Sequence, residues 1–229
     1  MMAIKAIFFD CGQVLVNYNT PMFVSELEKN SRSPNTIDVL KNIWQRKFVD
    51  LELDKITLKE FYDYLKFALE LKDEYSFEQF EKLFAMVVSI DPKMIAIKDA
   101  LWAQGYYMVM VSNNNRFHME LFRNHYPEVI NRFHYLMISS DFGFRKPDER
   151  MFIQPMGVYG LSPGECLLIE DTDANLEVFR KLGGVGYKYD VTMGRGYADP
   201  LLSIIERRHL VCMLNHLGLL RNYDLYNYM

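Results

Sequence analysis

Long hydrophobic runs are missing from this chain of 229 residues, although half of its residues are hydrophobic. No apolar stretch approaches the ~18 residues that a transmembrane helix requires. The N-terminal apolar run is interrupted by Asp10 and has no cleavage-like end, so we expect neither a membrane span nor a signal peptide. An excess of positive charge is missing too. The net charge of −4 predicts no binding to nucleic acid or to an anionic membrane.

Cysteine is scarce, and glycine is absent from one long segment. The three cysteines are odd in number and scattered (Cys11, Cys166 and Cys212). This usage excludes a disulfide framework and favours reduced thiols in the cytoplasm. Residues 17–89 contain no glycine. The same segment has no convincing strand pattern, so we expect it to be helical throughout.

Short apolar runs alternate with helical patterns in the rest of the chain. We predict strands at 4–9, 107–111, 135–138, 166–169 and 185–189. Helices are expected at 92–104, 117–124, 149–159 and 174–182, with Gly105, Gly160 and Gly183 just beyond three of them, where helix-ending glycines occur. Alternation of this kind predicts an α/β fold with a Rossmann-like parallel sheet.

Two capping-box patterns predict helices inside the glycine-free segment. Thr57 to Glu60 opens one expected through residue 71, and Ser76 to Gln79 opens another through about residue 88. We therefore divide the chain into a core of residues 1–16 and 90–200, an inserted helical subdomain of residues 17–89, and a helical extension of residues 201–229. The extension should contain a helix at 201–219 and a tyrosine-rich end with Tyr223, Tyr226 and Tyr228. We expect a monomer or a homodimer.

An aspartate stands at the end of the first predicted strand. Asp10 follows the apolar run and precedes a turn with Gly12. The carboxyl edge of a parallel sheet is where α/β proteins place their ligands. An aspartate there is able to serve as a nucleophile or as a metal ligand. The signal is weak alone, because many strands end in aspartate.

Polar residues follow two further predicted strands. Ser112 and Asn113 come directly after a strand, which suits an oxyanion site, although the pattern taken alone favours a polar loop. Lys146 precedes a proline at a predicted helix start. Its ammonium either neutralises a phosphate or is solvated. Arg145 is expected to be solvated or to contact the inserted subdomain.

Two adjacent acids, Glu170 and Asp171, end another buried strand. Carboxylates held together repel one another unless a cation joins them. Ligands that are all oxygen select a hard cation, most simply Mg²⁺. The alternative is a capping cluster for the next helix. We assign capping to Thr172 or Asp173, and metal binding to Glu170 and Asp171.

These four segments, in this order, resemble the four motifs of the haloacid dehalogenase (HAD) superfamily. The resemblance covers residues 4–17 and 92–189, with the helical insert at the position of that superfamily's C1 cap. Residues 111–118 and 142–147 look most like bacterial sugar-phosphate phosphatases, including α-D-glucose-1-phosphate phosphatases. The resemblance therefore implies an Mg²⁺-dependent phosphatase acting on a small phosphorylated metabolite.

The resemblance also implies roles for individual residues. Asp10 and Lys146 would be catalytic, Asp10 as the nucleophile and Lys146 as the group that neutralises charge. The phosphate would be bound by Cys11, Gly12, Ser112, Asn113 and Lys146. The metal would be held by Asp10, the backbone carbonyl of Gly12, Glu170 and Asp171. Charge neutralisation around an in-line transfer is what phosphoryl chemistry requires.

One position departs from the family's pattern. Most phosphatases of the superfamily have an aspartate two residues after the nucleophile, where it acts as a general acid–base. This chain has Gly12 there. Related members with the same pattern exist, so inactivity does not follow. Two alternatives remain: a non-catalytic phosphate-binding or regulatory protein, and a metal-independent haloacid dehalogenase. The acid pair at Glu170 and Asp171 argues against the dehalogenase.

Overall fold

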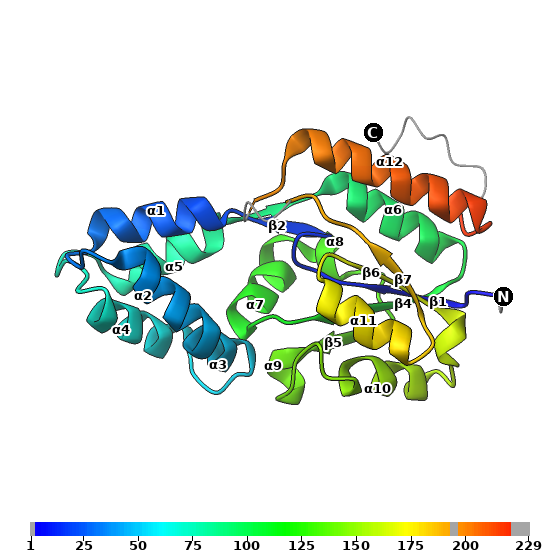
Figure 1. The fold of residues 1–229 in the computed structure, drawn as a ribbon, viewed down its shortest axis with the longest axis horizontal. Helices are drawn as coiled ribbons and strands as arrows, with labels where there is room; N and C mark the ends of the chain where they lie inside the picture. Colours follow the sequence, from blue (N-terminus) through cyan, green and yellow to red (C-terminus); the bar gives the residue numbers. More distant parts are fainter. Residues whose placement is uncertain (1–2, 193–196, 221–229) are drawn as a thin grey trace.

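A five-stranded parallel sheet forms the centre of the protein (Figure 1). The computed structural model describes residues 3–192 and 197–220. The spatial order of the strands is β5-β4-β1-β6-β7, which places β1 in the middle. Their bounds are β1 (Ala6–Phe9), β4 (Tyr107–Ser112), β5 (Tyr135–Ile138), β6 (Cys166–Glu170) and β7 (Val185–Lys188). All five strands lie within one residue or two of their predicted bounds, so the α/β prediction is confirmed.

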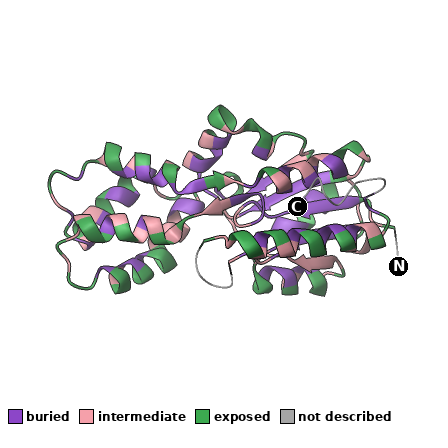
Figure 2. Cartoon of the chain, turned by 90° about the horizontal axis from the view of Figure 1, so that it is seen from above, coloured by how far each residue is buried: buried purple, intermediate pink, exposed green. Residues whose placement is uncertain are grey.

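Helices cover both faces of the sheet. Ile7 and Phe9 of β1 face one hydrophobic layer, whereas Ala6 and Phe8 face the other. The first layer is completed by α6 (Pro92–Ala103), α7 (Arg116–His125) and α12 (Pro200–His216). The second is completed by α10 (Arg150–Val158) and α11 (Asp173–Lys181). Because both faces are covered, β1 is apolar at every position, and β4 and β6 are buried and apolar up to Ser112 and Glu170 at their carboxyl ends, apart from the exposed Tyr107 (Figure 2).

The inserted helical block lies beside the core and is joined to it at two neighbouring points (Figure 1). It consists of α1 (Thr20–Asn30), α2 (Thr36–Ile43), the π-helix η1 (Trp44–Phe48), α3 (Val49–Glu52), α4 (Leu58–Ala68) and α5 (Phe77–Met86). Both capping boxes are present, at Thr57 and at Ser76. The helix α4 ends at Ala68, before the predicted residue 71, because Glu70 has a left-handed φ of 49°.

The expectation of no strand in residues 17–89 was wrong. Two short strands, β2 (Val16–Tyr18) and β3 (Val88–Ile90), pair antiparallel where the block joins the core. Each has three residues, which is too short for an alternating pattern to be detected in the sequence. Pairing across the two connections fixes where the block begins and ends.

The remaining elements are short or lie near the C-terminus. They are α8 (Pro127–Ile130), α9 (Ser139–Phe142) and the 3₁₀ turn η2 (Pro163–Glu165). Gly105, Gly160 and Gly183 follow their helices with positive φ, as predicted. The predicted helix 201–219 is the shorter α12, whose Arg207 pairs with Asp91 at the start of α6 at 2.6 Å. The tyrosine-rich end lies outside the described residues.

Hydropathy gives one further result. In residues 3–192 and 197–220, every helix is too short or too polar to cross a bilayer.

Candidate functional site

Asp10 leaves the central strand β1 at the carboxyl edge of the sheet. Its backbone N–H donates to the carbonyl of Ile169 on the neighbouring strand at 2.9 Å, which continues the sheet pairing through this residue. The side chain is 8% exposed, and its Oδ1 accepts from the N–H of Cys11 at 2.6 Å. Burial and the charge of Glu170 raise the pKa of Asp10 well above its ordinary value, while Lys146 opposes them.

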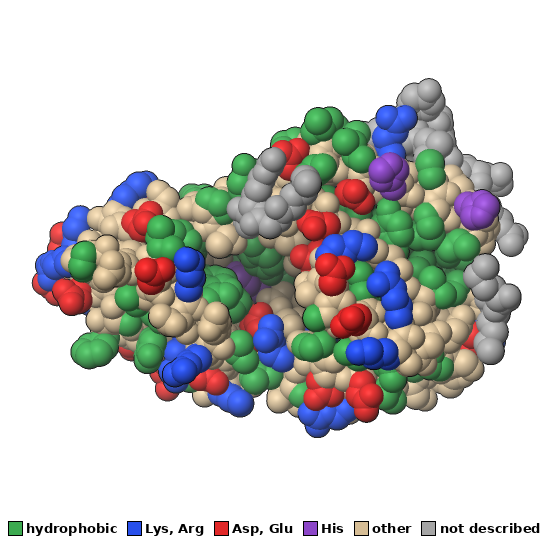
Figure 3. Space-filling view, in the orientation of Figure 1, with side chains coloured by type: hydrophobic (Ala, Val, Ile, Leu, Met, Phe, Trp, Pro, Cys, Tyr) green, Lys and Arg blue, Asp and Glu red, His purple; other side chains and the backbone are tan. Residues whose placement is uncertain are grey.

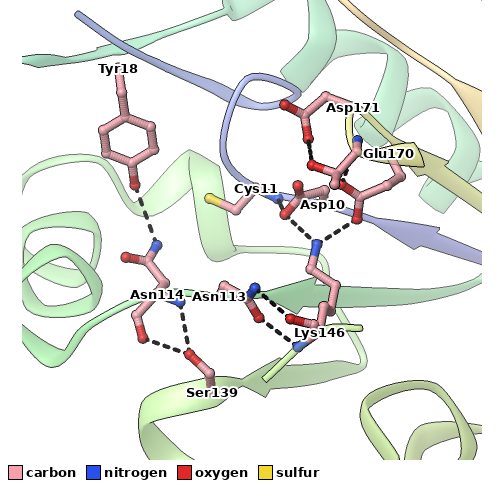
Figure 4. A network of polar contacts seen from close by, with 10 residues as sticks. Asp10, Cys11, Tyr18, Asn113, Asn114, Ser139, Lys146, Glu170 and Asp171 are labelled. Atoms are coloured by element: carbon pink, nitrogen blue, oxygen red, sulfur yellow. Dashed lines mark hydrogen bonds and ion pairs between the residues drawn. The ribbon is translucent and has the colours of Figure 1, made fainter. Parts of the chain in front are cut away.

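Lys146 joins two of the carboxylates (Figure 4). Its Nζ lies 2.8 Å from Asp10 Oδ1 and 2.6 Å from Glu170 Oε2, and the residue is 2% exposed. Burial favours the neutral amine, but the two carboxylates outweigh it and raise the pKa of Lys146. A buried ammonium is therefore fixed beside Asp10, and the solvated alternative for Lys146 was wrong.

Three carboxylates meet where β1 and β6 end. Oxygens of Asp10, Glu170 and Asp171 lie within 4.8 Å of one another. Burial acts against the ionised form of Glu170, but Lys146 and hydrogen bonds lower its pKa to about 2. Burial and contact with Glu170 raise the pKa of Asp171 to about 7. Two of the three acids thus carry an unfavourable negative charge that one lysine does not relieve.

This donor set fits a divalent cation. All three side-chain ligands offer oxygen, which Mg²⁺ prefers, and they converge from two adjacent strands. A bound cation would offset the mutual repulsion that raises the pKa values of Asp10 and Asp171. The predicted grouping of Asp10, Glu170 and Asp171 is therefore present in the structure.

The assignment of helix capping to Thr172 or Asp173 was wrong. Thr172 occupies the capping position of α11, but its side chain makes no capping hydrogen bond. Its hydroxyl donates instead to Asp171 Oδ1 at 3.1 Å. Asp173 forms an ion pair with Lys188 at 3.0 Å. Thr172 thus orients a candidate metal ligand.

Ser112 and Asn113 stand at the end of β4, beside Asp10. Ser112 is the last residue of β4 and is 1% exposed. The side chain of Asn113 holds the backbone of Lys146 from both sides, since its Oδ1 accepts from the Lys146 N–H at 2.7 Å and its Nδ2 donates to the Lys146 carbonyl at 3.0 Å. The sequence suggested only a phosphate-binding role for Asn113. Its side chain positions the lysine.

The turn after Asp10 is compact. The carbonyl of Cys11 accepts from the N–H groups of Leu15 and Val16 at 2.9 and 3.0 Å. A Cβ on Gly12 would lie 3.2 Å from Cε2 of the Tyr18 ring. The thiol of Cys11 is buried, and burial with the charge of Asp10 raises its pKa, which excludes thiolate chemistry at neutral pH.

Several contacts between the helical block and the core could not be seen in the sequence. Glu52, at the end of α3, is 7% exposed and lies with Oε2 3.0 Å from Arg145 Nε. Burial raises the pKa of Glu52, and Arg145 opposes the shift. The hydroxyl of Ser139 donates to the Glu52 carbonyl at 2.7 Å. Arg145 thus contacts the block, which was one of its two predicted states.

A cavity of about 210 Å³ lies between the block and the core. The surface is visibly hollowed between these two parts (Figure 3). Gln13 and Asn113 line the cavity, and each follows a predicted phosphate-binding residue in the chain. The cavity therefore adjoins the cluster around Asp10.

His118 is a buried histidine with a defined tautomer. Its Nε2 lies 3.0 Å from the carbonyl of Phe84 on the block, so this nitrogen carries the proton. Its Nδ1 lies 3.2 Å from the side-chain amide nitrogen of Asn115, which donates to it. Burial lowers the pKa of His118 to about 4. A second proton, on Nδ1, would point at the amide donor of Asn115, so the folded state disfavours the charged ring.

We expect acid to destabilise the protein through His118. The unfolded state binds the proton near pH 6.5 and the folded state only near pH 4, so stability falls as the pH drops through this window, by about 3 kcal/mol at most. Denaturant unfolding at pH 7.5 and 4.5 measures the net change, and the difference between the native protein and His118→Gln isolates the histidine's share, because Asp10 and Asp171, with raised pKa values, act in the opposite direction. His118→Gln should reduce it, whereas His125→Gln, at an exposed site, should not. Equal losses in both variants would refute the assignment.

Known proteins were compared with the chain and its fold. A sequence model of the haloacid dehalogenase-like hydrolases matches residues 4–183. Among solved structures, an HAD family enzyme from Bacteroides thetaiotaomicron, in complex with magnesium and inorganic phosphate, has a TM-score of 0.70 and 22% identity over 81% of this chain and 94% of its own. A predicted HAD-like hydrolase from Porphyromonas gingivalis has a TM-score of 0.69 and 23% identity over 82% and 92%.

A third solved structure has the same fold. An HAD phosphatase from Thermococcus onnurineus has a TM-score of 0.62 and 16% identity over 86% of this chain and 92% of its own. The TM-scores of these three structures establish the shared fold. The family match covers most of the chain, from β1 to the end of α11. The chain belongs to the haloacid dehalogenase-like hydrolases.

Proposed function

We propose that this hydrolase is an Mg²⁺-dependent phosphatase that cleaves small phosphorylated metabolites through an aspartyl-phosphate on Asp10. The observation that carries the proposal is the buried cluster in which Lys146 lies 2.8 Å from Asp10 while Glu170 and Asp171 complete an oxygen-only site. The magnesium and phosphate bound by the Bacteroides enzyme support it. Sugar phosphates are the first class to screen, on the sequence resemblance.

In the proposed reaction, a carboxylate oxygen of Asp10 attacks phosphorus as the bond to the leaving oxygen breaks. Water then cleaves the acyl phosphate and restores Asp10. Lys146 neutralises charge shared by Asp10 and the phosphoryl group. Ser112 and the backbone N–H groups of Asn113 and Cys11 bind phosphoryl oxygens.

The metal would be held by Asp10, Glu170, Asp171 and the carbonyl of Gly12. When bound, Mg²⁺ supplies positive charge that stabilises the developing negative charge on the phosphoryl group. Asn113 keeps Lys146 in place through two backbone hydrogen bonds, and Thr172 orients Asp171. The helical block acts as a cap that excludes water from Asp10 until the phosphoryl group has transferred.

Removal of Mg²⁺ should abolish turnover of an aryl phosphate, and Asp171→Ala should raise the Mg²⁺ concentration for half-maximal rate by ~10-fold or more. Titration calorimetry with Mg²⁺ should show the same loss of affinity without reference to activity. The control is Asp173→Ala, which removes an exposed carboxylate two residues away. A full rate in excess chelator would overturn the proposed metal dependence.

Gly12 favours one alternative, a non-catalytic phosphate-binding protein. No side chain there supplies a general acid, and the Tyr18 ring covers the position. Such a protein would bind Mg²⁺ and phosphate without hydrolysing any ester. A metal-independent dehalogenase would instead release halide in the presence of chelator. One assay with aryl phosphate and one with a 2-haloacid, each with and without Mg²⁺, separate the three functions.

Leaving-group acidity should control the rate. Without a carboxylic acid at Gly12, the leaving oxygen departs with little proton donation, which ordinarily contributes ~10²–10⁴-fold. Aryl phosphates and sugar 1-phosphates should therefore react faster than simple primary alkyl phosphates. Single-turnover phosphorylation across esters of graded acidity measures this dependence.

A variant that introduces the missing carboxylic acid at position 12 must also make room beside the Tyr18 ring. Gly12→Asp alone would place its Cβ 3.2 Å from the Tyr18 ring. Gly12→Asp combined with Tyr18→Leu removes the crowding, and Tyr18→Leu alone is the control. The double variant should show a shallower dependence than the control. A shallow dependence in the native protein would mean that another group already donates the proton.

A further inference from the structure

The cavity between block and core adjoins the proposed phosphate site. It is lined by Gln13 and Asn113, whose chain neighbours Gly12 and Ser112 belong to the proposed phosphate-binding set. Glu52, Trp44 and Phe48 line it from the helical block. A phosphoryl group on Asp10 would therefore direct its ester substituent toward this space. The lining of the cavity should decide which substituents fit.

Aromatic rings form much of its wall. The aromatic residues that line it are Tyr18, Phe23, Trp44, Phe48 and Phe84. Trp44 and Phe48 stack on each other with ring centres 4.0 Å apart and planes 13° apart. They are the first and last residues of the π-helix η1. Short π-helical turns frequently occur at functional sites, and this one places two stacked rings against the same cavity.

Most polar side chains at the cavity are already used within the protein. Asn19 caps α1, Asn113 holds the Lys146 backbone, and Asn115 caps α7. His118 bonds to Phe84 and to Asn115, and Asn114 accepts from the Asn115 N–H at 2.9 Å. These groups offer little to the hydroxyls of a sugar.

Two oxygens of lining residues lack a hydrogen bond in the part of the chain that the structure describes. They are Gln13 Oε1 and Glu52 Oε2; both are fully buried, and the latter faces Arg145 as an ion pair, so neither is an open acceptor in the cavity. A substituent with many hydroxyls would leave most of its hydroxyls unpaired, which is costly in a buried site. A flat apolar substituent needs no such partners.

We propose that the preferred substrates carry a planar aromatic or heteroaromatic ring, close to the phosphate, in this cavity. The inference rests on the proposed function, since it names the substrate class of the same site. The volume is sufficient, because an apolar cavity of about 150 Å³ accommodates benzene. The ring packs against Trp44 and Phe48, which line the cavity.

A pair of esters with similar leaving oxygens tests the preference. Benzyl phosphate and glucose 6-phosphate are both primary alkyl esters, but only the first has an aromatic ring. The native protein should show a kcat/KM at least about tenfold higher for benzyl phosphate. Trp44→Leu should lower this ratio by about tenfold, whereas Trp102→Leu, on the core helix α6 and outside the cavity, should preserve it. A ratio at or below one in the native protein overturns the inference.

A binding measurement separates this inference from the proposed function. The chain has two tryptophans, so Trp102→Phe leaves Trp44 as the sole reporter. Benzylphosphonate should change its fluorescence and bind at least about tenfold more tightly than methylphosphonate. Equal affinities, or an unchanged Trp44 signal at saturation, would contradict the ring site. If benzylphosphonate binds selectively but no ester is hydrolysed, the cavity assignment stands and the phosphatase proposal fails.

Discussion

Asp10→Asn should reduce turnover of aryl phosphates by ~10⁴-fold or more, with the fold intact. The amide has nearly the size of the carboxylate but carries no negative charge and is a poor nucleophile. Rapid quenching should detect no phosphorylated protein. Asp141→Asn, at an exposed site on α9, is the matched control and should keep the native rate.

Asp10→Asn should keep or increase the stability of the protein, although it lowers the activity. Because burial and Glu170 raise the pKa of Asp10, the folded state is destabilised by the ionised carboxylate at neutral pH. Asp10→Asn should therefore unfold at the same or a higher denaturant concentration than the native protein, as is common for substitutions in strained active sites. Substantial turnover in Asp10→Asn would exclude the aspartyl-phosphate mechanism. Denaturant unfolding also shows whether any loss of turnover arises because the variant is unfolded.

Lys146→Met should combine a large loss of activity with a large loss of stability. The ammonium lies 2.8 Å from Asp10 and 2.6 Å from Glu170, and all three groups are buried. Methionine fills similar space but leaves two carboxylates without their cation. Breaking such a buried pair costs about 3 kcal/mol or more. Denaturant unfolding at pH 8 measures the change.

Two comparisons make this prediction specific. Lys82→Met removes an exposed lysine that pairs with Glu78 and should change stability by less than about 0.5 kcal/mol. Adding Mg²⁺ should stabilise Lys146→Met more than the native protein, because the cation then provides the only positive charge in the cluster. If Mg²⁺ stabilised both proteins equally, Lys146 would not be the counter-charge of these carboxylates.

The central sheet and the motif positions could be predicted from the sequence because they follow local rules. A strand buried on both faces is a continuous apolar run, and β1 and β6 are read directly in this way. Parallel strands share one carboxyl edge, so residues that end them must meet there. Strand direction therefore predicts that Asp10 lies beside Glu170 and Asp171, and the structure has them together.

The connections and the cavity could not be predicted in this way. The ribbon of β2 and β3 is stabilised by pairing between residues about 70 positions apart, and three residues give no periodic signal. In the sequence, nothing distinguishes Glu52 from other acidic residues on predicted helices. Its contact with Arg145 depends on how the block packs on the core. The capping error is local instead: the Thr172 hydroxyl donates to the adjacent Asp171 carboxylate and accepts no hydrogen bond from the N–H groups of α11.

The sequence alone therefore determined the fold class and the group of residues around Asp10, since burial periodicity and strand direction are local properties. Only the tertiary structure decided what surrounds that group. It showed that Asn113 holds Lys146 through its side chain, that Tyr18 covers Gly12, and that Trp44 and Phe48 line the adjoining cavity. No local pattern gives these relations: Asn113 and Lys146 are 33 positions apart within the core, and Trp44 and Phe48 reach the cavity only because the block packs on the core.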